Sequence, residues 1–210
     1  NVFNIMNFIT YMFCGFVFCC LIFLFNDFTK LLYGNNYVLG MMEVIIICLN
    51  FYIATMLLPL ESVKSAAGLY YEDRYISLIQ AAINVFISII LGLKIGLIGV
   101  LLGTFISYIL TTVWERPIII YKEIFKSNSI VYFKKYILQI FIIVFNILLD
   151  YLVITKLFTQ VTILNFILKG ITIFIVYVVT NIIIFIKSNE LQYILKTIKD
   201  KFFNKNKVNG

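Results

Sequence analysis

Residues 2–26 read VFNIMNFITYMFCGFVFCCLIFLFN and carry no charged side chain. As a helix rising about 1.5 Å per residue, this stretch is about 37 Å long, which exceeds the roughly 30 Å hydrocarbon core of a membrane. A helix satisfies every backbone polar group within its own segment, and lipid offers these groups no other partner. The stretch therefore predicts a transmembrane helix.

The composition indicates the same class of protein. Of the 210 residues, 62% are hydrophobic, 17% aromatic and only 13% charged, a balance that lies outside that of soluble domains. The first residue is Asn1, with no basic segment or cleavage site before the apolar run, so we interpret the chain as a fragment of a longer protein. With no histidine, imidazole metal sites and histidine catalysis are excluded, and no cofactor or metal is expected.

Five further apolar runs have the length that a tilted membrane helix needs. They lie at 38–60, 75–93, 95–114, 136–155 and 170–186. Only Lys94 and its flanking glycines separate the third run from the fourth, which predicts a tight antiparallel hairpin. The expected fold class is all-α: a six-helix membrane bundle over 1–187, followed by a basic amphipathic tail over 188–210.

Basic residues are distributed unequally between the two ends of these predicted helices. Thirteen fall on one side, including those of the 61–74 and 115–135 loops and of the tail, and four on the other: Lys30, Lys94, Lys156 and Lys169. Because Lys and Arg are retained on the cytoplasmic side, both ends of the fragment are predicted to be cytoplasmic. A net charge of +7 concentrated on the inner membrane face argues against a nucleic acid partner.

The tail repeats apolar residues at helical spacing, with lysines on other faces of the same helix. The apolar positions are Leu191, Ile194, Leu195, Ile198 and Phe202. This pattern predicts a helix that lies on the inner membrane surface, with anionic lipids as the partner of its lysines.

Two predicted spans carry stripes of polar residues. In the third span the stripe is Ser77, Gln80, Asn84 and Ser88, and in the fifth it is Gln139, Asn146 and Asp150. Such a stripe faces protein or a water-filled path, because unpaired amides and carboxylates are costly in hydrocarbon. The functional interpretation is a translocation path. The alternative is interhelical hydrogen bonding worth roughly 0.6–2 kcal/mol per contact, and for Gln80 and Asn84 both stay open.

Two carboxylates fall inside predicted spans, each near the outer end of its helix. Ionisable groups in spans are rare and typical of pathways, ion pairs or proton relays. For Asp150 we favour a functional role, whereas for Glu43 we favour a side chain that reaches outward to the membrane surface. In the fourth span, the small residues Gly96, Gly99, Gly103 and Ser107 share one face and predict close helix packing rather than phosphate binding.

A series of short motifs follows in order from the second predicted span to the loop after the fourth. It comprises Pro59 to Lys64, Ala66-Ala67-Gly68-Leu69-Tyr70-Tyr71, Asp73-Arg74-Tyr75, Leu78-Ile79-Gln80-Ala81, Asn84, Gly96, Gly99, Gly103-Thr104, Ser107, Trp114, Pro117, Tyr121-Lys122 and Phe125. The series covers about residues 31–126. It resembles the bacterial flippases of polysaccharide repeat units, the capsule and O-antigen members of the multidrug/oligosaccharidyl-lipid/polysaccharide exporter superfamily. Gln80 stands where the resemblance would place an acidic residue.

The resemblance implies a fourteen-helix, two-lobed transporter of the bacterial cytoplasmic membrane, of which this chain is roughly the last six helices. The missing N-terminal part of the same protein is then a partner. Its substrate would be an undecaprenyl-diphosphate-linked oligosaccharide, flipped to the outer leaflet without making or breaking a bond, so no enzymatic activity is expected. Lys64, Arg74 and Arg116 would receive the diphosphate at the cytoplasmic mouth. Their alternative role is to hold the loops inside.

Three other interpretations stay open. A cation-coupled multidrug exporter of the same superfamily would use an acidic coupling site such as Asp150. A membrane-embedded glycan polymerase or ligase would carry catalytic groups on a sizeable outer loop, whereas the outer connections here are short. A fragment that lacks one lobe is also compatible with a non-transporting remnant.

Overall fold

The computed structural model describes residues 2–71 and 74–203 of the chain, and every regular element in these ranges is helical. The elements are α1 (Val2–Tyr33), the short 3-10 helix η1 (Asn35–Tyr37), α2 (Met41–Met56), α3 (Leu58–Ala67), α4 (Ile76–Ile95), α5 (Leu97–Leu110), α6 (Thr112–Glu123), α7 (Ile130–Leu157), α8 (Ile163–Phe185) and α9 (Asn189–Phe203). Asp73 of the motif series and the tail residues Lys205 and Lys207 lie outside the described residues.

Six helical segments are long and apolar enough to cross a membrane, which confirms the all-α, six-helix prediction. Two of them are the pairs α2–α3 and α5–α6, each counted as one segment. Many large apolar side chains face outward, as a lipid-embedded surface requires. Leu93, Phe141 and Ile183, for example, are 86%, 67% and 67% exposed.

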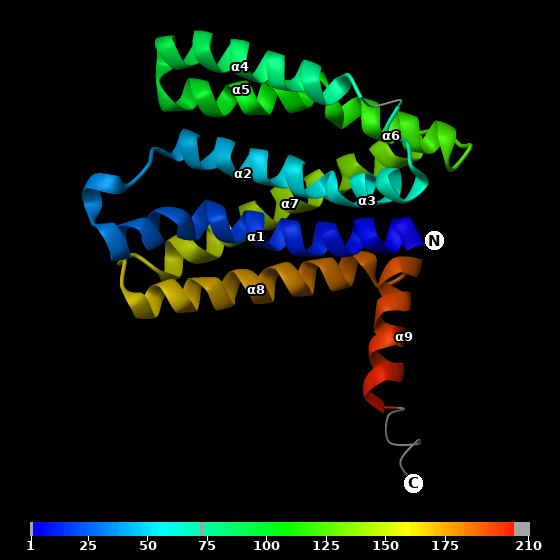
Figure 1. The fold of residues 1–210 in the computed structure, drawn as a ribbon. Helices are drawn as coiled ribbons and strands as arrows, with labels where there is room; N and C mark the ends of the chain where they lie inside the picture. The colour runs from blue at the N-terminus through cyan, green and yellow to red at the C-terminus, as the bar shows by residue number, and fades with distance from the viewer. Residues whose placement is uncertain (1, 72–73, 204–210) are drawn as a thin grey trace.

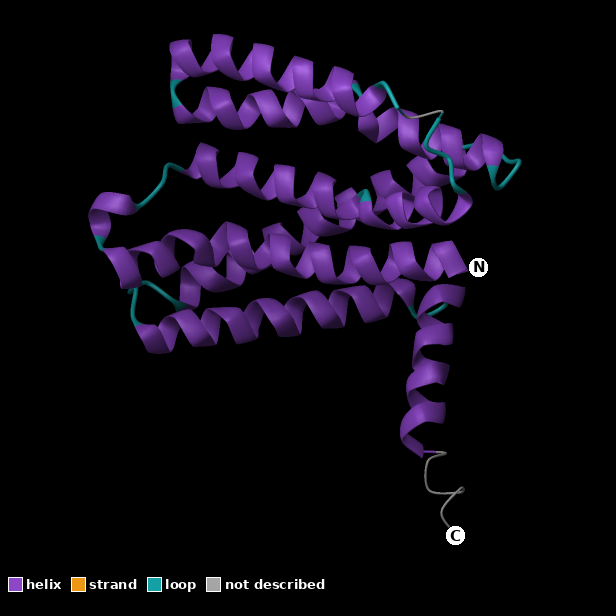
Figure 2. Cartoon of the chain, viewed as in Figure 1, coloured by secondary structure: helices purple, strands orange, loops and turns teal. Residues whose placement is uncertain are grey.

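The helices lie in a layered bundle with α1 at its centre (Figure 1). α1 packs against α2 and α8 and also contacts α7, α3 and α9. α2 connects this core to α5, and α4 packs mainly on α5 at the edge of the bundle. Figure 2 shows that the described segments outside the helices are short turns and loops.

Basic residues gather at one end of the bundle, which we call the basic end. It contains the start of α1, α3, α6, the start of α7, and α9, with Lys64, Arg74, Arg116, Lys122 and Lys135 among its cations. The other end, which we call the opposite end, holds the α1–α2, α4–α5 and α7–α8 connections. Both ends of the described chain lie at the basic end (Figure 1).

The helices extend beyond the predicted apolar runs, so that several charged residues predicted to lie in loops are in helices instead. The predicted 61–74 and 115–135 loops are partly helical, because α3 extends to Ala67 and α6 to Glu123. Lys169, expected in an outer loop, instead lies inside α8, where it is 7% exposed. The helix begins earlier than the apolar run because a cation that is paired with a carboxylate, here Asp27, is tolerated within a helix bundle.

The predicted hairpin between the third and fourth spans is present as α4 and α5. Gly96 joins them with φ +64°, a left-handed conformation that favours glycine. Close approach of the two helices requires the small residues of α5. A Cβ added to Gly99 would lie 2.1 Å from the Leu91 carbonyl oxygen, and one added to Gly103 would lie 2.7 Å from the Ser88 nitrogen. The glycine face is therefore a packing surface.

Candidate functional site

Polar side chains run through the interior of the bundle between α1, α7 and α8, and we call this set the polar seam. All eight are buried except Thr180, which is partly buried. The members are Asn7, Tyr11, Gln139, Asn146, Asp150, Tyr177, Thr180 and Asn181. The predicted stripe of α7 thus faces protein rather than lipid.

Asn146 joins α7 to α8 in the middle of the seam. Its Oδ1 accepts a hydrogen bond from Thr180 Oγ1 at 2.5 Å, and its Nδ2 donates to the Ile142 carbonyl at 2.8 Å. Because the side chain is fully buried, both of its polar atoms need partners inside the protein, and both have them.

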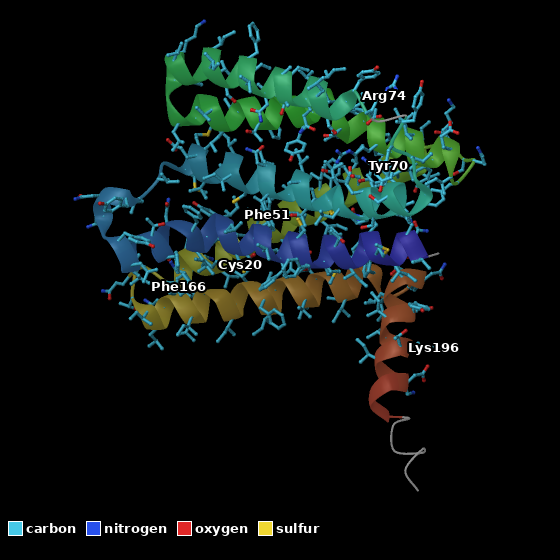
Figure 3. The ribbon with its side chains drawn as sticks, in the orientation of Figure 1. Cys20, Phe51, Tyr70, Arg74, Phe166 and Lys196 are labelled. Carbon is cyan, nitrogen blue, oxygen red and sulfur yellow. The ribbon has the colours of Figure 1, made fainter. Side chains whose placement is uncertain are left out.

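Asp150 lies one helical turn beyond Asn146 and is also fully buried. Neither oxygen of its carboxylate has a hydrogen-bond partner among the described residues. The Cys19 and Cys20 thiols of α1 lie within electrostatic reach of the carboxylate. Cys20 is labelled in Figure 3, about midway along α1. A buried carboxylate with neither a cation nor a donor is costly, so Asp150 is the member of the polar seam that its contacts explain least.

A tyrosine pair connects α1 to α8 nearer the basic end. Tyr11 Oη donates to Asn181 Oδ1 at 2.8 Å, and Tyr177 Oη donates to the Tyr11 carbonyl at 3.3 Å. The Tyr177 hydroxyl lies against Gly15, where an added Cβ would be only 2.4 Å away. The glycine therefore makes room for the Tyr177 ring between the two helices.

A second ionisable group inside the bundle, Lys169, is paired with a carboxylate. Lys169 Nζ of α8 lies 2.6 Å from Asp27 Oδ2 of α1, and the two side chains are 9% and 16% exposed. This ion pair fastens α1 to α8 near the opposite end. Asp150 and Lys169 are thus chemically distinct cases, one unpaired and one neutralised.

The polar stripe of α4 is used within the α4–α5 hairpin. Asn84 Oδ1 accepts a hydrogen bond from Ser88 Oγ at 2.9 Å and one from Thr104 Oγ1 of α5 at 3.5 Å. Gln80 is partly buried one turn earlier. For Asn84 this geometry favours the structural alternative over a translocation path.

Two of the three cations expected to bind a diphosphate meet a carboxylate. Glu61 of α3 forms ion pairs with Lys64, at 3.0 Å, and with Arg116 of α6. Lys64 is 8% exposed. Because one carboxylate lies between two cations, the net positive charge of this cluster is reduced. The ion pair between Glu61 and Arg116 also joins α3 to α6 at the basic end.

Arg74 lies apart from that cluster. Its guanidinium stacks 4.2 Å from the ring centre of Tyr71 and 4.5 Å from that of Tyr75. The side chain borders an open cleft of about 530 Å³ that Lys122 and Ile118 also line. In Figure 3 Arg74 lies near the surface at the basic end.

The sequence patterns found the α7 stripe but missed the residues that it meets. Thr180, Asn181 and Tyr11 do not stand out, because single polar residues in apolar helices carry no stripe of their own. The pairing of Asp27 with Lys169 was missed because both flank predicted spans.

No protein-family model, curated protein or solved structure matches the chain.

Proposed function

We propose that the chain is part of a cation-coupled membrane transporter that flips a polyprenyl-diphosphate-linked oligosaccharide, with Asp150 as its coupling carboxylate. The motif series of residues 31–126 supports the substrate class by resemblance. The single observation that carries the coupling role is the fully buried Asp150 carboxylate, which has no partner among the described residues. Such a group binds a proton or cation in one state of a transport cycle and releases it in another.

The basic end supplies the cations that a diphosphate needs. Arg74 and Lys122 border an open cleft there, whereas Lys64 and Arg116 are already paired with Glu61. Lys122 is itself 3.4 Å from Glu123, which lines the same cleft, whereas Arg74 meets aromatic rings and no carboxylate among the described residues. A cation that no carboxylate holds binds phosphate oxygens more readily than a paired one. Under this proposal the basic end faces the cytoplasm, where the lipid-linked substrate is made, and Arg74 is the first contact.

Asp150→Asn in the full-length protein tests the coupling role. The amide keeps the size of the side chain and is cheaper to bury than a carboxylate, so membrane insertion and abundance should stay near normal. Surface polysaccharide should fall to near background, and lipid-linked repeat units should accumulate on the inner leaflet. Normal surface polysaccharide at normal protein abundance would remove Asp150 from the mechanism.

Asp27→Asn is the matched control, since Asp27 is also a carboxylate inside the bundle but is paired with Lys169. This change leaves Lys169 buried without its partner, which costs about 3–5 kcal/mol and should lower protein abundance. Transport per remaining molecule should be preserved. The two variants therefore separate a coupling carboxylate from a structural one.

A multidrug exporter of the same superfamily is the second candidate, and one observation favours it. A cavity of about 240 Å³ between α1, α2, α5 and α7 is lined by aromatic and aliphatic side chains, among them Phe18, Tyr52, Phe105 and Tyr136. Aromatic faces attract organic cations. If this candidate holds, Asp150→Asn should increase sensitivity to cationic drugs and leave surface polysaccharide unchanged.

A further inference from the structure

A second cavity, with several polar side chains in its lining, lies at the basic end, where α1 and α7 meet the corner between α8 and α9. Its volume is about 190 Å³. The polar residues of its lining that matter here are Asn7, Lys135, Gln139 and Glu190. Three helices and the first turn of α9 therefore line a partly open space whose mostly apolar surface carries these polar groups.

Two residues that line this cavity each carry a buried amide oxygen without a partner among the described residues. Asn7 and Gln139 are each 5% exposed, and neither Asn7 Oδ1 nor Gln139 Oε1 accepts a hydrogen bond within the described part of the chain. A buried acceptor without a hydrogen bond is energetically costly, so each of these oxygens needs a donor from outside the described residues. Because one water needs only about 10–15 Å³ of such water-accessible space, the cavity has room for several waters, which find polar partners in its lining.

The polar seam leads from this cavity into the bundle. Asn7 precedes Tyr11 by one turn of α1, Tyr11 donates to Asn181, and the neighbouring Thr180 donates to Asn146. Asp150 follows Asn146 by one turn. Along α7 the path from Gln139 to Asp150 covers eleven residues, about 16 Å of helix. Polar groups thus continue from the basic end to the unpaired carboxylate.

We propose that this cavity is a water-filled inlet through which Asp150 exchanges its proton with bulk water at the basic end. The proposal deepens the coupling role of Asp150 and rests on it. The ligand is water, held by the amide oxygens of Asn7 and Gln139. The proton leaves or reaches a carboxylate oxygen of Asp150 and is carried by water and the hydroxyl groups of the seam, while the amide groups hold the water in place.

The titratable groups around this path are few. Cys19 and Cys20 of α1 lie within electrostatic reach of Asp150, Tyr11 and Tyr177 belong to the seam, and Lys135 and Glu190 line the cavity. Lys135 Nζ lies 2.9 Å from Glu190 Oε1, so the two charges at the mouth neutralise each other. A neutral mouth admits water without attracting either sign of ion.

Infrared difference spectroscopy on the full chain in lipid nanodiscs tests the exchange route. After acidification, the carbonyl stretch of protonated Asp150 should appear, and Asp150→Asn should remove it. Transfer into D₂O shifts this band at the rate of proton exchange. Gln139→Leu should slow that shift by about tenfold, the effect of one lost hydrogen bond on a transfer barrier, and leave the titration midpoint unchanged. Asn7→Leu is a second variant with the same expected result.

Cysteine accessibility tests the hydration of the cavity independently. In a background without the four native cysteines, Gln139→Cys should react with a small charged thiol reagent added at the basic end. Ile137→Cys is the matched control, because this position is two residues away on α7 and 52% exposed on the lipid-facing surface. The control thiol lies in hydrocarbon and should stay unreactive.

The outcomes separate this proposal from the coupling role. Equal inertness of both cysteines, or unchanged exchange rates in both leucine variants, would overturn the inlet even if Asp150→Asn blocks transport. Conversely, slowed exchange together with a reactive position 139 would support the inlet even if Asp150→Asn transports normally, in which case the coupling role fails alone.

Discussion

Asp150 and Lys169 are both ionisable residues inside membrane helices, and their surroundings decide what each does. Lys169 has a carboxylate at 2.6 Å, so its charge is neutralised and the pair holds two helices together. Asp150 has no such partner among the described residues and remains available to bind a proton. At this scale, the role proposed for Asp150 rests on the missing contact rather than on the residue type.

Gly15→Ala should destabilise the bundle at the residue scale. The new Cβ would lie 2.4 Å from Tyr177 Oη and 3.3 Å from Ile143 Cδ1, and the buried Tyr177 ring has little room to move. We expect the free energy of unfolding to fall by about 1–3 kcal/mol, which is typical of overpacking. The hydrogen bond from Tyr177 to the Tyr11 carbonyl should also be lost. The free energy of unfolding in mixed detergent measures the loss.

Gly170→Ala is the control for that experiment. An added Cβ there would meet only Leu24 Cδ1 at 3.7 Å, an ordinary van der Waals contact. The alanine should therefore be neutral or slightly stabilising. Equal stability of the two variants would show that the close approach at Gly15 is relaxed by small movements of its neighbours.

At the scale of elements, α9 differs from the spans in direction and in chemistry. It turns away at the basic end and runs across the direction of the other helices (Figure 1). Leu191 packs into the core, whereas Tyr193, Leu195 and Ile198 are exposed alongside Lys196. In Figure 3 the Lys196 label lies on the part of α9 beyond the bundle. This arrangement supports the proposal that α9 lies on a surface of anionic lipids.

The docking of α9 should depend on pH through Glu190. Burial by itself raises the pKa of this carboxyl, but the hydrogen bond and charge of Lys135 outweigh it and hold the pKa below its usual range. The ion pair therefore stabilises the docking of α9 fully at pH values above the ordinary pKa of Glu. This stabilisation is lost as the pH falls through the lowered pKa of Glu190. Spin labels at Ile9→Cys and Thr197→Cys should give one narrow distance at neutral pH and a broad distribution in acid.

Glu190→Gln should broaden that distance already at neutral pH and abolish the pH dependence. Glu123→Gln serves as the control, because Glu123 pairs with Lys122 and Lys126 on α6 and not with α9. A narrow, pH-independent distance in the Glu190→Gln variant would show that apolar packing of Leu191 alone holds the helix.

At the scale of the whole molecule, the asymmetric distribution of basic residues predicts the orientation. Ser127 lies in the loop between α6 and α7 at the basic end, and Asn35 and Lys156 lie at the opposite end. In a background without native cysteines, an impermeant thiol reagent added to whole cells should label Asn35→Cys and Lys156→Cys and spare Ser127→Cys. Permeabilised cells should label all three. Labelling of Ser127→Cys in intact cells would reverse the proposed orientation.

The sequence by itself determined the class of fold and the number of spanning helices. Both follow from the length and hydropathy of single segments, such as 2–26, and each segment satisfies its own backbone in lipid. The hairpin was also predictable, since the few residues between the two spans, around Lys94 and Gly96, are too few for any connection other than a tight turn. Its glycine face was predictable from the helical spacing of the small residues. The stripe of Asn146 and Asp150 was visible because helical spacing is a local property.

Only the tertiary structure decided which polar groups meet. Thr180 reaches Asn146 across 34 residues of chain, and Lys169 reaches Asp27 across 142. Partners between helices depend on how the helices pack and rotate, and one helix's sequence carries no record of the face that its neighbour presents. The same reason explains why Glu61 neutralises Arg116, while Asp150 stays buried with no partner among the described residues.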